Sequence, residues 1–342
     1  MTFHASPWTY ESRLPRFFPL RITLPSIILI TAAITGSGGS SLRNGTIVLP
    51  IQQEDSRVQN YYANAHPYLE EPLDKLRKRI PELGKIHPTE DLQQLPAILQ
   101  NTARNVDSFF RDIVDVIANE RITQERLDSR GMVMASARVR DNYLILRHLN
   151  AARADIIEYR MDDKGNRMDH PGLNEGYFAT LGFALSCNYF STAFQPELKF
   201  RYLGDQKVGP QDSYVVAFTQ QPGKATLFVT MAGRGGSRVP MLIQGVAWVG
   251  KANFQIIRMR MDLLAPRPEI GLQQLTTVVT LGKVQLLDVA TPLWLPKEVK
   301  VDLKFREFDP AHANSLAVEF RNAHQYVDYR RYRVSVKINP QH

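Results

Sequence analysis

The sequence predicts an α+β fold: about eleven antiparallel strands in a sheet that curls into a barrel or wraps around the helices, with helical segments on its concave face. Three observations support this prediction. The apolar spacing changes from a helical period to a strand period near Val116. Short turn sequences then separate the strands at hairpin spacing. A segment that is apolar nearly all round, residues 172–196, interrupts the strands and has to be buried.

Two helices are predicted ahead of the strands. Residues 67–81 form a short amphipathic helix between two prolines, with apolar residues three and four apart: Leu69, Leu73, Leu76 and Ile80. A longer helix begins at Pro96, because proline suits a first helical turn. One face of it is apolar: Ile98, Leu99, Thr102, Val106, Phe109, Phe110 and Ile113. Such a face needs a large surface to pack on.

Alternating apolar residues predict the strands. The clearest is 298–306, where every second residue is apolar and its neighbours are charged. Residues 253–263 also alternate and place Ile257, Met259, Met261 and Leu263 on one side. Hairpin spacing favours an antiparallel sheet, and so long a meander has to curl. Further strands are predicted at 119–128, 138–148, 153–161, 197–204, 214–218, 225–231, 241–249, 277–281, 317–321 and 326–337.

The amino terminus resembles an export signal. Arginines precede the apolar run 22–34, and small residues follow it. The run is shorter than the roughly 20 residues that span a bilayer as a helix, so we expect cleavage between Ala33 and Ser41, with an uncleaved anchor as the alternative. The predicted location is the periplasm or cell envelope. The predicted divisions are a signal peptide or anchor at 1–36, a linker at 37–65, a helical amino-terminal extension at 66–90 and a half-barrel domain at 91–340.

The sequence carries no catalytic or metal-binding motif. Cys187 is the single cysteine, its neighbours match no nucleophile signature, and the eight histidines are scattered. Glu120 and Glu125 lie beside arginines on one predicted strand and are interpreted as members of cross-strand ion pairs rather than as a general acid and base. We therefore expect no enzyme activity, cofactor or metal, and a hydrolase is the lowest-ranked alternative. The net charge of +8 fits a solvated basic face without a nucleic-acid motif.

Residues 244–259, with Gly245 and Trp248, resemble the central hairpin of the periplasmic lipoprotein-carrier (Lol-type) superfamily. Gly250 stands where that family usually has Asp. The layout from 95 to 338 is also similar to that of the superfamily. Segments 200–204 and 264–268 resemble uncharacterised exported bacterial proteins. The resemblance implies a curled, unclosed antiparallel β-barrel of about eleven strands, with helices covering a hydrophobic concave face that can hold acyl chains.

We therefore expect an exported binding or carrier module for a lipid or other hydrophobic ligand. The alternative is a non-enzymatic structural or protein-interaction module whose cavity is plugged by residues 172–196. Expected partners are a hydrophobic small molecule or acyl chain, an envelope protein and a peripheral membrane contact, but no nucleic acid. Methionines, aromatics and neighbouring apolar residues are candidates for lining the ligand site, although alternation also allows them to be ordinary core. They are Phe228, Trp248, Ile257, Met259, Met261, Leu263, Phe178 and Leu181.

Overall fold

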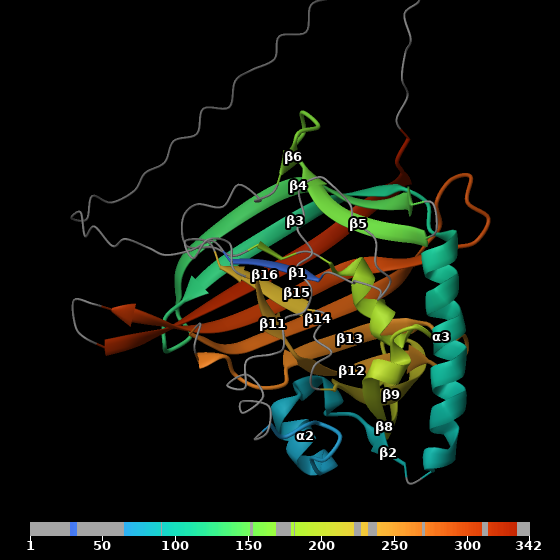
Figure 1. The fold of residues 1–342 in the computed structure, drawn as a ribbon, viewed down its shortest axis with the longest axis horizontal. Helices are drawn as coiled ribbons and strands as arrows, with labels where there is room; N and C mark the ends of the chain where they lie inside the picture. Colours follow the sequence, from blue (N-terminus) through green and yellow to red (C-terminus); the bar gives the residue numbers. More distant parts are fainter. Residues whose placement is uncertain are drawn as a thin grey trace, which may run out of the picture.

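Twelve strands form one antiparallel sheet in the described part of the chain, in the order β2-β8-β9-β12-β13-β14-β15-β16-β3-β4-β5-β6 (Figure 1). The sheet ends at β2 on one side and at β6 on the other, so the barrel is not closed. This confirms the predicted fold class. The computed structural model describes residues 28–32, 65–89, 91–150, 153–168, 179–180, 182–221, 227–231, 238–268, 271–309 and 314–333.

The strands of the large sheet are long except for its two edge strands. The edge strands have two residues each, β2 (His87–Pro88) and β6 (Arg167–Met168). The segments expected as two strands at 317–321 and 326–337 form one continuous strand that ends at Arg331. The other strands are β3 (Val116–Leu127), β4 (Val133–Asn150), β5 (Arg153–Met161), β8 (Leu198–Val208), β9 (Gln211–Gln220), β12 (Ile243–Gly250), β13 (Ile256–Leu263), β14 (Leu272–Val284), β15 (Leu293–Asp309) and β16 (Asn314–Arg331).

The strand order explains why one segment lies inside the curl. The chain leaves the sheet at β6 on one edge and re-enters it at β8 on the opposite side. Residues 182–197, which we name the crossing segment, therefore lie on the concave face. They contain two 3-10 helices, η3 (Ala184–Phe190) and η4 (Gln195–Glu197). The predicted burial of this part of 172–196 is confirmed, and its helical turns are 3-10 rather than α.

The two predicted helices are present but cover opposite faces. Helix α3 (Leu95–Asp112) packs on the concave face together with η3. Helix α2 (Leu73–Arg79) and the 3-10 helix η1 (Pro81–Leu83) pack on the other face. Strand β12 is buried at every residue, so the sheet needs a cover on both sides there. The expectation that helices cover the concave face therefore holds for α3 but not for α2. Within the described ranges, no helix is long and apolar enough to cross a bilayer.

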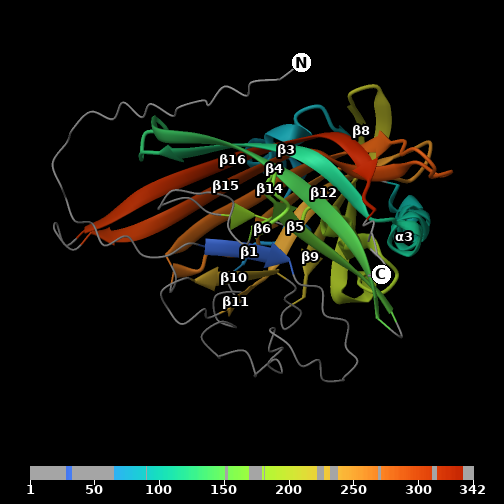
Figure 2. The same cartoon turned by 90° about the horizontal axis from the view of Figure 1, so that it is seen from above.

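A second, four-stranded sheet lies beside the large one (Figure 2). Its order is β11 (Arg238–Met241), β10 (Leu227–Met231), β1 (Ile28–Ala32) and β7 (Ala179–Thr180). Strand β1 pairs antiparallel with β10 and parallel with β7. It belongs to the apolar run that we expect to act as a signal peptide or anchor. The rest of residues 1–36 and residues 37–64 lie outside the described residues.

Candidate functional site on the concave face

Strands β12 to β15 give the concave face an apolar half. Met259 on β13 is fully buried and pairs with Ala247 on β12 and Val279 on β14. The same buried core continues across β14 and β15 through Val279, Leu281, Val299, Val301, Leu303 and Phe305. A continuous apolar wall of this kind can bind either protein side chains or an acyl chain.

Aromatic rings of the crossing segment pack near one end of this wall. The Tyr189 ring stacks on Phe218 at a centroid distance of 5.9 Å. The Phe190 ring meets Phe218 edge-on at 5.5 Å and Phe200 at 5.3 Å. Ring pairs at these separations are favourable beyond the area they bury. The crossing segment therefore covers the concave face through side-chain contacts and not through sheet pairing.

Polar contacts attach the crossing segment to the sheet and to α3. On β5, Glu158 accepts a hydrogen bond from the Leu185 backbone N–H at 2.9 Å and another from the Tyr143 hydroxyl. Burial raises the pKa of Glu158, although these donors oppose the shift. On the α3 side, Asp107 accepts bonds from the Thr192 backbone N–H at 3.2 Å and from the Thr192 hydroxyl at 2.5 Å. The Gln195 side chain also donates to the Leu99 carbonyl oxygen of α3 at 2.9 Å, so the segment is attached both to the sheet and to α3.

The other half of the concave face carries a buried charge cluster centred on Glu120. Arg160 donates to both oxygens of this carboxylate, through Nε at 2.5 Å and Nη2 at 2.8 Å. The Tyr326 hydroxyl donates at 2.8 Å, and His324 Nδ1 lies 2.9 Å away. Burial alone would raise the pKa of Glu120, but Arg160 and His324 lower it to about 2. Burial also lowers the pKa of His324, although its hydrogen bond with Glu120 and the charge of Glu120 oppose this shift.

This cluster keeps unused hydrogen-bonding capacity. Arg160 Nη1 and Asp141 Oδ2 are buried without a hydrogen-bond partner in the described part of the chain, although Asp141 Oδ2 forms an ion pair with Arg160 Nε at 4.0 Å. Burial, and then the charge of Glu120, raises the pKa of Asp141 to about 6. A buried donor or acceptor that makes no hydrogen bond is costly. A polar group of a ligand would satisfy both atoms, so this half of the face suits the polar end of a molecule.

Cys187 lies in η3 and does not have the character of a nucleophile. Its thiol donates to the Ala184 carbonyl oxygen at 3.3 Å. Burial, and then the charge of Glu158, raises the pKa of the thiol to about 12. The thiol is therefore protonated at neutral pH, and the thiolate is the reactive form.

The predicted lining residues do not share one surface. Met259, Met261 and Leu263 face the concave core, as the alternation predicts. Trp248 and Ile257 belong to the opposite core, under α2. Ile257 lies on this opposite face because the pairing of β12 with β13 shifts register between Trp248 and Val249. The shift breaks the alternation of side chains on β13. Phe228 lies in β10, but its side chain, like Phe178 and Leu181, lies outside what the structure describes.

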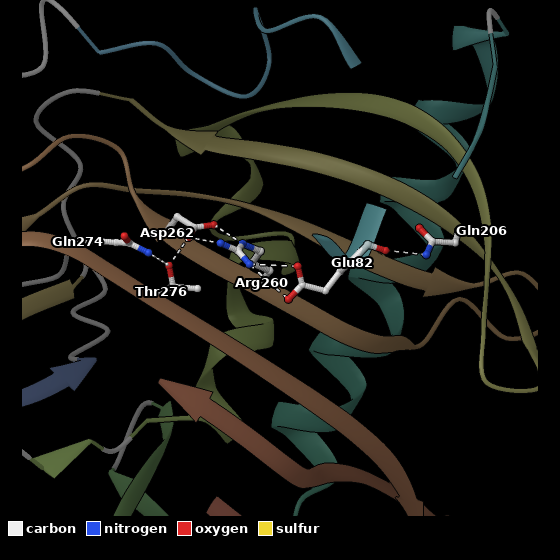
Figure 3. A network of polar contacts seen from close by, with 6 residues as sticks. All are labelled: Glu82, Gln206, Arg260, Asp262, Gln274 and Thr276. Atoms are coloured by element: carbon white, nitrogen blue, oxygen red, sulfur yellow. Dashed lines mark hydrogen bonds and ion pairs between the residues drawn. The ribbon is translucent and has the colours of Figure 1, made fainter. Parts of the chain in front are cut away.

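The face opposite the concavity carries a polar network that fixes the amino-terminal extension (Figure 3). Arg260 on β13 pairs with Glu82 of η1 at 3.0 Å and with Asp262 at 2.7 Å. Asp262 also accepts from the Thr276 hydroxyl at 2.6 Å, and Gln206 donates to the Glu82 carbonyl oxygen at 2.7 Å. Gln206 also accepts a hydrogen bond from the Trp248 indole N–H at 3.1 Å, so the network joins the amino-terminal extension to the sheet on the face opposite the concavity.

The sequence analysis missed the charge cluster, although a signal for it exists. On β4, residues 139, 141, 143 and 145 share the face that carries buried Ile145. Asp141 and Tyr143 therefore occupy positions of β4 at which the alternation predicts apolar side chains. The expected cross-strand ion pairs of Glu120 and Glu125 are present: Glu120 pairs with Arg160 on β5, and Glu125 pairs with Arg321 on β16.

The geometry defines an α+β half-barrel whose concave face has an apolar and a polar half. No protein-family model matches the chain, and no curated protein matches it. A domain named as an outer membrane lipoprotein-sorting protein, from Vibrio parahaemolyticus, is 11% identical, with 68% of this chain and 91% of that chain covered and a TM-score of 0.35. A DUF1329 family protein from Desulfovibrio piger is 12% identical, with 71% and 94% covered and a TM-score of 0.27. These TM-scores are below 0.5, so the fold assignment depends on the observed strand pairing alone.

Proposed function

We propose that this chain is a non-catalytic carrier or binding module for a lipid or acylated molecule in the cell envelope. The observation that carries the proposal is the two-part concave face. An apolar wall on β12–β15 adjoins a buried polar cluster on β3, β4, β5 and β16. An amphiphile has the same two parts, an acyl chain and a polar group. Each acyl methylene buried on the wall would contribute about 0.8 kcal/mol to binding.

The cover of the concave face supports ligand exchange. The crossing segment is joined to the core by ring contacts and by the hydrogen bonds of Glu158 and Asp107. An entering acyl chain would replace the ring contacts of Tyr189 and Phe190 with apolar contacts of its own. Displacing the segment therefore leaves the strand pairing of the large sheet intact.

One observation favours a second function, that of a structural or protein-interaction module. Phe190 is fully buried and contacts two rings of the sheet, so the crossing segment already fills part of the concavity. In this case the segment is a permanent plug, and the partner is an envelope protein bound elsewhere.

Native mass spectrometry of the chain purified from a native-like host tests the proposal directly. We expect a mass adduct that corresponds to a bound lipid, and uptake of an environment-sensitive acyl probe after the lipid is removed. An unliganded mass together with no probe uptake would contradict the carrier function.

Two matched substitutions separate the functions. Phe190→Ala removes a ring from the crossing segment, whereas Leu76→Ala removes a buried side chain of α2 on the opposite face. A carrier predicts that Phe190→Ala increases probe uptake and that Leu76→Ala does not. A permanent plug predicts that neither variant takes up probe. Both substitutions remove a buried side chain and lower stability in either case, so probe uptake by Phe190→Ala is the result that separates the two functions.

A further inference from the structure

The end of the β3–β4 hairpin presents apolar side chains to solvent. Every residue from 129 to 136 is exposed, and β3 and β4 extend to the periphery of the molecule (Figures 1 and 2). Met132 is 64%, Val133 50% and Met134 68% exposed. Three consecutive large apolar residues in water are unfavourable, and such a patch marks an interaction surface.

A rigid turn holds this tip in place. Asp128 Oδ1 accepts hydrogen bonds from the backbone N–H groups of Arg130 at 2.8 Å and Met132 at 2.9 Å. Gly131 has a φ of 77°, a left-handed conformation that glycine adopts without strain. The apolar side chains are therefore presented by an ordered loop and do not depend on a partner to become ordered.

Three arginines that form no ion pair within the described residues lie on β3 and β4, next to the tip. Arg121 on β3 is directly opposite Arg140 on β4 in the pairing register. Arg138 is opposite Thr123, two residues nearer to the tip. All three are exposed and form no ion pair within the described residues. Like charges directly opposite destabilise a sheet. Nearby Arg321, in contrast, pairs with Glu125 and Asp302.

Part of the apolar tip lies on the same side of the hairpin as the arginines. Arg140 is opposite Arg121, and Arg138 lies two residues from Arg140, so these three side chains share one face. Val133 is opposite Leu127, which lies an even number of residues from Arg121 on β3, so Val133 is on this face too. Guanidinium groups bind phosphate oxygens in a bidentate manner, and apolar side chains enter the boundary between headgroups and acyl chains. The charges therefore complement an anionic lipid surface.

We propose that the β3–β4 hairpin docks onto an anionic lipid bilayer, with Met132, Val133 and Met134 entering the headgroup boundary while Arg121, Arg138 and Arg140 bind lipid phosphates. This surface is separate from the concave face, so the proposal goes beyond the carrier function and does not depend on it. Salt weakens the binding of this hairpin to the bilayer, because the charges of exposed arginines are screened.

Co-sedimentation of the full chain with vesicles tests the docking. We expect binding to vesicles of phosphatidylglycerol and phosphatidylcholine, and much weaker binding to phosphatidylcholine alone. Arg138→Gln combined with Arg140→Gln should weaken binding on the order of 20-fold. Met132→Ser combined with Met134→Ser should also weaken it, whereas circular dichroism should show both variants folded.

The matched control is Arg330→Gln combined with Arg331→Gln, which removes the same charge at the opposite end of β16, away from the hairpin tip. This control should bind like the unmodified chain. Equal weakening by the control, unchanged binding of either hairpin variant, or no binding to anionic vesicles overturns the proposal. A concentration-dependent dimer that buries the hairpin without vesicles, abolished by the hairpin variants, also overturns it.

Discussion

Arg160 on β5 holds both carboxylate oxygens of Glu120 on β3 while both side chains are fully buried. Strand β4 lies between β3 and β5, so the ion pair bridges three neighbouring strands. Tyr326 and His324 bring β16 into the same network. The cluster therefore ties the beginning of the strand meander to its last strand, and fixes the register on this side of the curl.

Breaking this pair should be strongly destabilising. Arg160→Met leaves the Glu120 carboxylate buried without its main counter-charge, and we expect a loss of about 3–5 kcal/mol in the free energy of unfolding. Urea denaturation measures this loss. Combining Arg160→Met with Glu120→Leu should restore part of the stability, because the uncompensated charge is then absent. A double variant less stable than Arg160→Met would contradict this account.

Asp141 should give the protein an inverse dependence of stability on pH. Its pKa is raised from 3.8 to about 6 by burial and by Glu120. Between these values the folded chain keeps a proton that the unfolded chain has lost, so this group's contribution to stability falls as the pH rises from about 4 to about 6. Asp141→Asn removes the effect.

Urea denaturation at pH 4 and at pH 8 checks this prediction. Relative to the unmodified chain, Asp141→Asn should gain on the order of 2 kcal/mol between the two pH values. A stability difference between the two proteins that is the same at both pH values would show that Asp141 titrates normally.

The helices and strands could be predicted from the sequence because each depends on local periodicity. Sheet register could not be predicted as well. The register shift beside Trp248 turns Ile257 to the face opposite Met259, and apolar alternation alone contains no signal for it. The two expected strands at the carboxyl end are one, because their pairing with β15 and β3 continues across the polar residues between them.

The candidate site was harder to predict than the fold. Alternation identifies an apolar face, and it located Met259, Met261 and Leu263 correctly on the concave side. It does not identify which distant residue will compensate a buried charge. Glu120 and Arg160 are 40 residues apart and meet only because β4 brings their strands together. The cluster becomes predictable only when the pairing of β3, β4 and β5 is known.

Loosening the cover of the concave face should be detectable by hydrogen exchange. Glu158→Ala removes the acceptor of the Leu185 N–H, so amides of η3 should exchange faster while those of β14 and β15 do not change. Glu125→Ala is the control, because it removes a carboxylate of a partly exposed pair on the other face of the sheet. Equal exchange in both variants would show that Glu158 does not hold the crossing segment.

The amino-terminal extension should prove to be part of the cooperative fold. Leu76 of α2 is fully buried against the face that carries Trp248 and Val246. Leu76→Ala should therefore lower the free energy of unfolding of the whole domain by about 2–5 kcal/mol. Lys78→Ala, an exposed position on the same helix, should have little effect. If Leu76→Ala left the main unfolding transition unchanged and only accelerated exchange within α2, the extension would be an independent appendage, and the network of Glu82 and Arg260 would add nothing to the stability of the sheet.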